Sequence, residues 1–331
     1  MTDQSEARGE APQEQASLPQ DVTYQAAPDS AGIRLDHFLV QECTGHSRSE
    51  ITRLIRSGAI LVNDQMVKPG RKLRQGDSIS VSIPEQPPEQ PLPRDIALNI
   101  LYEDDSILII DKPAGLVVHP GEGHRQDTLV NALLYHYPNL PGADPNRPGI
   151  VHRLDKDTSG TLVIAKNSVS LRRLSAAFKQ REVQKTYHAI LLRSPGPAQG
   201  RVVAPIGRHP VHRQKMAVRK EGNGRYAATR WEVLEAWPGF SLVEIAIETG
   251  RTHQIRVHMA SLGAPVAGDI LYGGRTKEIH GVPVSRQLLH ASTLRFNHPE
   301  TGQVVSCTAP LPPDMQQVLD QLRETQRNGI G

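Results

Sequence analysis

The side chains best suited to chemistry lie in one nonapeptide, residues 152–160, with the sequence H-R-L-D-K-D-T-S-G. It holds two carboxylates, Asp155 and Asp157, among basic side chains. An exposed loop carboxylate can act as a nucleophile or a general base, and Asp155 is our strongest candidate for that role. Asp157 and Ser159 are also frequent turn residues that bond the nearby backbone, so an ordinary surface turn explains the same spacing about equally well.

Two extended segments are expected to hold this loop. Residues 161–165, T-L-V-I-A, form an apolar run that is typical of a strand, and residues 148–151, P-G-I-V, indicate a turn leading into a short extended segment. A loop between two such segments presents its side chains on a rigid support, which is where functional residues concentrate.

Two other kinds of enzyme have comparable short motifs. A protein-kinase catalytic loop places its Asp directly after His-Arg, but here Leu154 intervenes, and the sequence contains neither G-x-G-x-x-G nor D-F-G. A metal-dependent RNA hydrolase needs paired carboxylate ligands, whereas Asp155 and Asp157 are two positions apart and diverge in an extended loop. His253 and His258 are five positions apart, not the four that place two ligands on one helix face, so we expect no metal site.

Tyr187 and Arg251 lie in two further blocks that could contribute to the same site. Tyr187 ends the segment K-T-Y in a predicted strand, and residues 250–256, G-R-T-H-Q-I-R, run from a turn into a predicted helix that begins at Gln254. A guanidinium beside a carboxylate lowers the carboxyl pKa by about 1–3 units, so Arg251 is a candidate partner for Asp155. The simpler alternatives are a turn-decorating Arg251 with Thr252 as the helix N-cap, and a core Tyr187 whose hydroxyl finds a partner.

Composition sets broad limits on the class of protein. The 331 residues carry a net charge of +3 and a pI of about 8.9, which is compatible with a polyanionic partner without requiring one. Two cysteines, Cys43 and Cys307, cannot build a disulfide framework or a cysteine-type zinc site, and we expect reduced thiols. No apolar signal core and no run of 18 apolar residues occurs. We expect a cytoplasmic monomer with no membrane contact.

The chain is predicted to divide into a small module and a larger domain. Residues 1–22 are polar and expected to be disordered, residues 23–84 form the module, and residues 85–94, with four prolines, form a linker. Residues 95–322 form the larger domain and residues 323–331 a C-terminal tail. Helices and strands mix without strict alternation, which favours an α+β fold.

The module combines two predicted helices with a small sheet. Apolar residues recur at helical spacing over residues 35–39, and the S-R-S-E sequence at residues 47–50 is a capping box that opens a second helix, which Gly58 ends. Residues 60–67 are predicted to form a β-hairpin and residues 77–83 a half-buried strand. Clustered basic side chains suit phosphate contact, although a solvated helix face is the simpler explanation. The candidates are Arg34, Arg48, Arg53, Arg56, Lys68, Arg71 and Lys72.

The larger domain mixes apolar strand-like runs with amphipathic helical segments. The predicted strands lie at residues 100–102, 107–110, 116–118, 161–165, 185–192, 230–236 and 241–249, and the predicted helices at 128–137, 169–180, 254–262 and 313–327.

Together the three blocks resemble the RluA/RluD family of RNA pseudouridine synthases, in the family's order and spacing, and the resemblance covers about residues 30–320. The module resembles the S4 RNA-binding domain that often precedes these enzymes. The resemblance implies a mixed, largely antiparallel central sheet with flanking helices and a cleft. It also implies an isomerase that needs no cofactor: the glycosidic C–N bond of uridine breaks, the uracil rotates, and a C–C bond forms to the same sugar carbon.

The resemblance also implies roles for single residues. Asp155 is the catalytic carboxylate, Arg251 its ion-pair partner, and Tyr187 the ring that stacks on the uracil, with its phenol oxygen placed to accept the C5 proton. Arg153 enters the RNA stack and fills the space of the extruded nucleotide, whose extrusion costs a few kcal/mol. Whether Asp155 attacks the sugar, adds to the base or abstracts a sugar proton stays open.

A dense basic loop at residues 208–218, R-H-P-V-H-R-Q-K-M-A-V, resembles the RluD-type branch of the family in particular. That branch modifies helix 69, a stem-loop of the large-subunit (23S) ribosomal RNA. We expect 23S rRNA, or the large-subunit precursor, as the partner, although a solvated hairpin tip would also explain the loop. The additional RNA-binding candidates are Arg208, Arg213, Lys215, His253 and Arg256, the last two as structural or RNA-facing groups.

Two alternative functions remain open at this stage. One is a pseudouridine synthase for other rRNA sites or for tRNA. The other is a non-catalytic RNA-binding protein of ribosome assembly, which the joint presence of Asp155, Tyr187 and Arg251 argues against.

Overall fold

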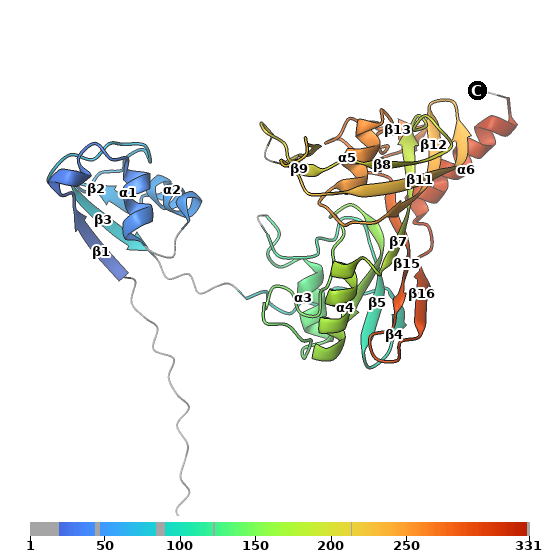
Figure 1. Cartoon of the computed structure of the whole chain (residues 1–331), viewed down its shortest axis with the longest axis horizontal. Helices are drawn as coiled ribbons and strands as arrows, with labels where there is room; N and C mark the ends of the chain where they lie inside the picture. Colours follow the sequence, from blue (N-terminus) through green and yellow to red (C-terminus); the bar gives the residue numbers. More distant parts are fainter. Residues whose placement is uncertain (1–19, 44–46, 84–89, 122, 213, 330–331) are drawn as a thin grey trace, which may run out of the picture. The chain divides into compact units, whose positions relative to one another are not determined.

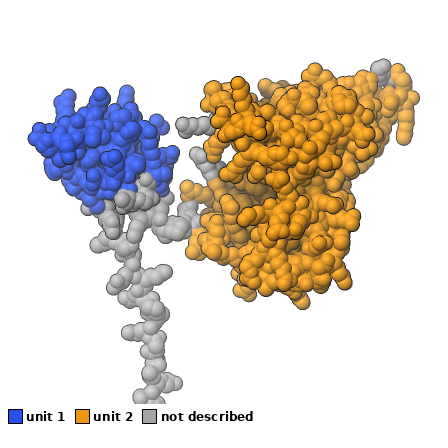
Figure 2. All heavy atoms as spheres, in the orientation of Figure 1, with its two compact units in different colours: residues 1–89 blue, residues 90–331 orange. Residues whose placement is uncertain are grey.

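The computed structural model of the protein describes residues 20–43, 47–83, 90–121, 123–212 and 214–329. The chain forms two compact units, residues 1–89 and residues 90–331 (Figure 2). We call them the N-terminal unit and the larger unit. Among the described residues, no helix combines the length and apolar character needed to cross a bilayer.

The N-terminal unit packs two helices on a three-stranded antiparallel sheet in the order β1-β3-β2 (Figure 1). Its core is formed by Leu35, Leu39, Ile51, Ile55 and Ile79, each fully buried. The elements are β1 (Gln20–Gln25), the 3-10 helix η1 (Pro28–Ser30), α1 (Leu35–Glu42), α2 (Arg48–Ser57), β2 (Ile60–Val62) and β3 (Ser78–Ile83).

The start and end of α2 confirm the signals predicted from sequence. Ser47 and Glu50 form a reciprocal capping box with two 3.3 Å hydrogen bonds. Gly58 ends the helix in the left-handed conformation, with φ +81°, which a residue without Cβ adopts at no steric cost.

Two predictions for this unit are wrong. The hairpin predicted over residues 60–67 does not form, because β2 pairs along its length with β3 and the chain after Val62 closes only a tight turn to Gln65. The disordered tail predicted through residue 22 extends too far, since β1 begins at Gln20 and pairs with β3; residues 1–19 lie outside the described part of the chain.

The larger unit is built on a nine-stranded sheet. The order is β4-β5-β6-β15-β7-β12-β11-β8, with β16 also paired to β15. Its pairings are antiparallel except for β6 with β15, which are parallel. This confirms the expected α+β class with a mixed, largely antiparallel sheet. The sheet strands are β4 (Ile100–Glu103), β5 (Ile107–Lys112), β6 (Ser159–Ala165), β7 (Gln184–Leu192), β8 (Gln199–Val203), β11 (Ala228–Trp237), β12 (Phe240–Ile247), β15 (Leu289–Asn297) and β16 (Val304–Thr308).

Helices cover both faces of this sheet (Figure 1). On one face, α3 (Leu129–His136) and α5 (Gln254–Ser261) share a core with Ala189 and Val243. On the other, α6 (Pro313–Arg327) packs with Ile190, the next residue of β7, because successive side chains of a strand alternate between faces. The remaining elements are α4 (Ser168–Gln180) and the short hairpins β9 (Ile206–Arg208) with β10 (Met216–Val218) and β13 (Glu278–Ile279) with β14 (Val282–Pro283).

Three predicted boundaries differ from the structure. Residues 116–118 form no strand, and Val117 makes only an isolated bridge with Thr128. Helix α6 has its predicted range, Pro313–Arg327, so the tail predicted from residue 323 begins too early; Arg323 lies in the helix and pairs with Glu235. Of the predicted linker, residues 85–89 lie outside the described residues, while residues 90–94 are hydrogen-bonded to α3 of the larger unit.

Candidate active site

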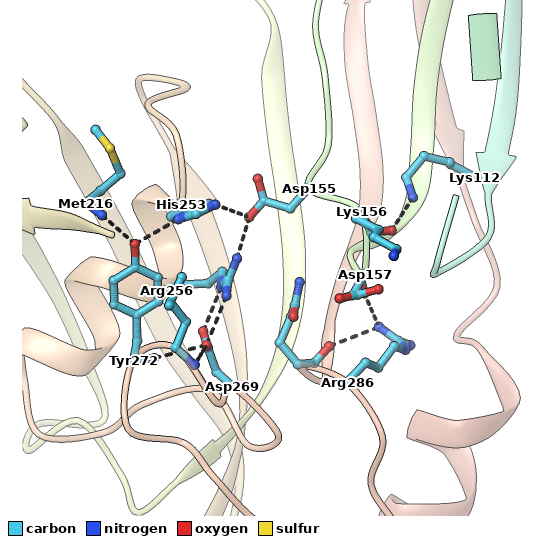
Figure 3. A network of polar contacts seen from close by, with 12 residues as sticks. Lys112, Asp155, Lys156, Asp157, Met216, His253, Arg256, Asp269, Tyr272 and Arg286 are labelled. Atoms are coloured by element: carbon cyan, nitrogen blue, oxygen red, sulfur yellow. Dashed lines mark hydrogen bonds and ion pairs between the residues drawn. The ribbon is translucent and has the colours of Figure 1, made fainter. Parts of the chain in front are cut away.

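Asp155 lies in the turn that precedes β6, and its side chain is 21% exposed. The turn closes on itself through the Thr158 N–H, which donates to the Asp155 carbonyl at 3.1 Å. Its next two carbonyls are each bound by a cation from elsewhere in the fold: Lys112 Nζ donates to Lys156 O at 3.0 Å, and Arg286 donates to Asp157 O at 2.9 Å. Figure 3 shows both cations meeting the turn on the side away from Arg256 and His253.

Lys112, the last residue of β5, is fully buried. Its ammonium donates three hydrogen bonds, all to backbone carbonyls, those of Pro113, Leu116 and Lys156. Removal from water disfavours the charged form and lowers the pKa of Lys112 to about 7. Hydrogen bonds to three carbonyls therefore hold Lys112 at a position where burial disfavours its charged form.

Arg286 connects the same turn to the last helix. One side of its guanidinium donates to Asp157 O, Gln287 O and Leu289 O. The other side pairs with both oxygens of Asp314 in the first turn of α6, at 2.6 and 2.9 Å. The Asp155 turn is thus tied to Arg286, 129 positions after Asp157, and through Arg286 to the first turn of α6.

Arg256, on the buried face of α5, contacts the Asp155 carboxylate directly. Its NH1 lies 3.1 Å from Asp155 Oδ2. Its Nε and NH2 form a two-point pair with Asp269, at 2.7 and 3.0 Å, and the Asp269 side chain is fully buried. Burial opposes the charge of Arg256, but the hydrogen bonds and negative charges of Asp269 and Asp155 outweigh it and raise the Arg256 pKa.

The predicted pairing of Asp155 with Arg251 is wrong in this structure. Arg251 precedes α5, where its N–H donates to the Gln254 side chain, and its guanidinium donates to the Tyr226 carbonyl at 3.0 Å. Arg256 was expected to be structural or to face RNA, yet it is the guanidinium bound to Asp155. The reason is helical geometry: Arg256 lies within α5 on the side that faces Asp155, whereas Arg251 lies in the turn before the helix.

His253 joins the Asp155 turn to the basic loop. It precedes α5 in the left-handed conformation, with φ +55°, so Thr252 is not the N-cap. Its Nε2 lies 4.0 Å from Asp155 Oδ2, and its Nδ1 is 2.8 Å from the Tyr272 hydroxyl. That hydroxyl accepts the Met216 N–H at 2.8 Å, so its own proton is available to Nδ1, which favours the tautomer with the proton on Nε2. Burial lowers the pKa of His253.

Tyr187 lies on β7 beside Asp155 and is only 8% exposed. Its ring packs in the core that α3 and α5 share with the sheet. Burial, and then the negative charge of Asp155, raise its pKa well above the usual range, so the phenol keeps its proton at neutral pH. Tyr187 is therefore a core aromatic residue at the edge of the site, and its predicted role toward the uracil stays a prediction.

Two adjoining hollows open at these residues. The smaller, about 100 Å³, is lined by Asp155, Tyr187, Arg256 and their neighbours, and we call it the Asp155 pocket. The larger, about 510 Å³, is lined by α4, β7 and residues 247–251. Arg153 and Arg251 line both. Three of the residues predicted from sequence, Asp155, Tyr187 and Arg251, thus surround one site, although Arg251 does not contact the carboxylate.

The sequence analysis did not identify several residues that hold the site in place. Lys112 follows the apolar run of residues 107–110 and the charged Asp111, so no apolar pattern in the sequence marks it as buried. Asp269, Tyr272 and Arg286 have no spacing pattern relative to Asp155, because the fold brings them together from distant segments.

The basic candidates of the N-terminal unit separate into two groups. Arg34, Arg48, Arg56 and Lys68 line a hollow of about 630 Å³. Asp36, at the floor of this hollow, accepts hydrogen bonds from Arg34 and Arg48. These hydrogen bonds lower the pKa of Asp36 to about 2, and the one from Arg34 has the largest effect. The other three lie outside that lining: Arg53 and Lys72 are exposed, and Arg71 pairs with Asp77.

In the basic loop, Arg208 is exposed at the end of β9 and Lys215 is half-buried just before β10. Arg213 lies outside the described residues. Through Tyr272, which binds both Met216 and His253, this loop is connected to the Asp155 turn (Figure 3).

Comparison with known proteins agrees with this geometry. Residues 106–261 match the family model for RNA pseudouridylate synthase, and residues 33–79 match the S4 domain. The chain is 44% identical over 328 residues to the ribosomal large subunit pseudouridine synthase D of Xanthomonas campestris pv. campestris, covering 94% of this chain and 96% of the relative. It is 41% identical over 311 residues to the protein of the same name from Pseudomonas aeruginosa, covering 91% and 95%.

A solved structure is also similar. Human RNA pseudouridylate synthase domain containing 4 has a TM-score of 0.53 and 29% identity, covering 68% of this chain and 93% of that one. Matches of this extent cover both the site and the sheet that carries it. The chain therefore belongs to the RNA pseudouridylate synthase family and is an RNA pseudouridine synthase with an N-terminal S4 domain.

Proposed function

We propose that the protein converts uridines to pseudouridine in the large-subunit (23S) rRNA, with the helix 69 stem-loop as its target, and acts as a monomer in the cytoplasm. The observation that carries the proposal is the Asp155 pocket, in which one carboxylate faces a buried Tyr187 and is bound by Arg256. The choice of RNA is supported by the relatives named as large-subunit synthases and by the sequence of the basic loop.

Asp155 is the group that opens the reaction in this proposal. Breaking the N1–C1′ bond and forming a C5–C1′ bond leaves a proton to be lost from C5 and one to be gained at N1, so atoms and charge balance without an oxidant or a second substrate. An ionised carboxylate suits attack on the sugar, addition to the base or proton abstraction. Arg256 holds that carboxylate at Oδ2.

Tyr187 supplies the wall against which the uracil stacks. Because its phenol keeps its proton, the phenol oxygen is a weak base, and it can accept the C5 proton only if it passes its own proton on. Arg153, exposed at the mouth of the Asp155 pocket, fills the place in the RNA that the extruded nucleotide leaves.

RNA is held at two further surfaces in the proposal. Arg34, Arg48, Arg56 and Lys68 line the hollow of the S4 domain and bind phosphates. The basic loop binds a second part of the RNA and is connected to the catalytic turn by Tyr272.

The first experiment is a base-resolution pseudouridine map of rRNA and tRNA from cells with and without the protein. Loss of signal in the helix 69 loop supports the proposal, whereas loss at other rRNA sites or in tRNA retains the enzyme and changes its substrate. No loss anywhere, in a strain without redundant enzymes, would favour a non-catalytic assembly protein.

The second experiment tests the carboxylate. Asp155→Asn should abolish isomerisation while RNA affinity stays nearly unchanged, because the amide keeps the shape but cannot act as nucleophile or base. Asp157→Asn is the matched control, since it alters the neighbouring carboxylate of the same turn and should remain active. An active Asp155→Asn enzyme would remove this mechanism.

A further inference from the structure

The larger of the two adjoining hollows has no role in the chemistry described above. It encloses about 510 Å³ between the C-terminal end of α4, the start of β7 and residues 247–251, and we call it the α4–β7 pocket. It shares part of its wall with the Asp155 pocket: Arg153, Tyr187, Ile247, Gly250 and Arg251 line both. A group bound in the α4–β7 pocket is therefore the direct neighbour of a base in the Asp155 pocket.

Positive charge dominates the lining of this pocket. Glu248 also lines it, but it already accepts hydrogen bonds from Arg201 at 2.9 Å and from Arg230 at 3.2 Å. His152 contributes no charge, because its Nε2 accepts the Val163 N–H at 3.0 Å and burial lowers its pKa to about 3. The cations in the lining are Arg153, Lys179, Arg181, Lys185 and Arg251.

These five cations lack acidic partners within the described parts of the chain, where no ion pair involves them. Lys185 is half-buried, with Nζ 5.8 Å from the Phe178 ring centroid, and Arg181 lies over Tyr226 at 5.1 Å. Burial and the charge of Arg181 lower the pKa of Lys185, and burial, Arg225 and Arg181 lower that of Arg251. Unpaired cations that repel one another are stabilised when an anion enters between them.

We propose that the α4–β7 pocket binds a phosphodiester of the RNA strand next to the target uridine. The inference rests on the proposed function for the identity of that strand. A nucleic acid carries a phosphate beside every base, so a base held at Asp155 brings an anion to the adjoining wall. Lys179 and Arg181, both exposed at the end of α4, and Lys185 at the start of β7 then bind the RNA backbone.

The variants can be chosen so that the fold is kept. Arg181 adopts φ +65°, so Arg181→Asn removes the charge with a residue that tolerates this conformation. Lys179→Ala removes an exposed helical side chain. The control is Arg295→Ala, because Leu294 is the register partner of Lys185 and Arg295 therefore points to the opposite face of the sheet.

Binding is measured on the full chain with fluorescein-labelled helix 69 stem-loop RNA and with a 12-nucleotide oligouridylate, between about 50 and 300 mM KCl. The double variant Lys179→Ala/Arg181→Asn should bind both RNAs about tenfold more weakly near 0.1 M salt. The negative slope of log K against log[salt] should become shallower by about 1.4, because each lost phosphate contact to a single strand removes about 0.7. Lys179→Arg keeps the charge and should keep the slope, and Arg295→Ala should match the wild type.

The rate of isomerisation under saturating RNA in a single turnover separates binding from chemistry. The double variant should match the wild type in that rate, because the pocket holds a phosphate and touches no reacting atom. Unchanged affinity and salt slope, or a lower saturated rate with unchanged affinity, would overturn the inference. A wild-type protein that isomerises neither RNA contradicts the proposed function instead, and the oligouridylate titration still tests the pocket.

Discussion

Replacing Lys112 by Met tests whether a buried, titrating amine holds the Asp155 turn. In the wild type, the Lys112 ammonium bonds three carbonyls, including that of Lys156 directly after Asp155. Its pKa is lowered from 10.5 to about 7. Between these two values the unfolded chain binds the proton and the folded protein releases it, so the free energy of unfolding rises with pH. Met fills a similar volume without a titrating group.

The size of the effect follows from the two pKa values. At pH 6 the folded and unfolded states are both protonated, and burial of the charge costs about 4–5 kcal/mol, at 1.36 kcal/mol per pKa unit. At pH 9 the folded amine is neutral and the remaining cost is about 2 kcal/mol. The free energy of unfolding of the wild type, relative to Lys112→Met, should therefore rise by roughly 2–3 kcal/mol from pH 6 to pH 9.

Urea unfolding followed by tryptophan fluorescence measures this difference. Both tryptophans of the chain, Trp231 and Trp237, are buried in the larger unit, so the signal reports on that unit. Lys112→Leu is the control, because the free energy of unfolding of the wild type relative to this variant should show the same rise with pH, whatever packing the leucine loses. A difference between wild type and Lys112→Met that stays constant from pH 6 to pH 9 would refute the argument.

Three further changes test other parts of the structure. Arg256→Lys should lower the single-turnover rate about 100-fold with little change in RNA affinity, because one ammonium cannot bind Asp155 and Asp269 as the guanidinium does. Gly160→Ala should lower the free energy of unfolding in urea by about 3 kcal/mol or more, because φ is +114° and a Cβ would lie 2.2 Å from the Ala291 carbonyl oxygen. The control is Gly239→Ala, where φ is +80° but a Cβ would meet open space, and which should cost about 1 kcal/mol. Deleting residues 1–84 should weaken RNA binding or change site choice while the tryptophan-reported unfolding stays the same; unchanged affinity and site choice would contradict an RNA-binding role for the S4 domain.

Much of the fold was predictable because its signals are local. The capping box at Ser47 and Glu50, the stop at Gly58 and the apolar strand at 161–165 each depend on a few neighbouring residues, and all three are confirmed. The pairing partners of strands were not predictable in this way. Strand β2 has an adjacent turn that suggests a hairpin, but its hydrogen bonds go to β3 across 15 intervening residues.

The candidate site shows the same division. Asp155 and Tyr187 were found because they lie in recognisable blocks of sequence. The choice of Arg251 over Arg256 failed because both lie in one block, and only the start of α5 decides which of them points at Asp155. Asp269 could not be chosen from sequence, since its importance comes from a contact with Arg256.

That contact with Asp269 determines how Arg256 holds Asp155. A guanidinium facing a carboxylate alone tends to bind both of its oxygens. Here Asp269 takes Nε and NH2 of Arg256 and leaves NH1, so Asp155 is bound at Oδ2, while Oδ1 has no hydrogen-bond partner among the described residues. A carboxylate held at one oxygen is fixed in position yet keeps the other oxygen for the substrate. Neutralising Asp269 would let Arg256 turn toward both oxygens of Asp155, so Asp269→Asn should reduce the rate at saturating RNA even though Asp155 and Arg256 are both present.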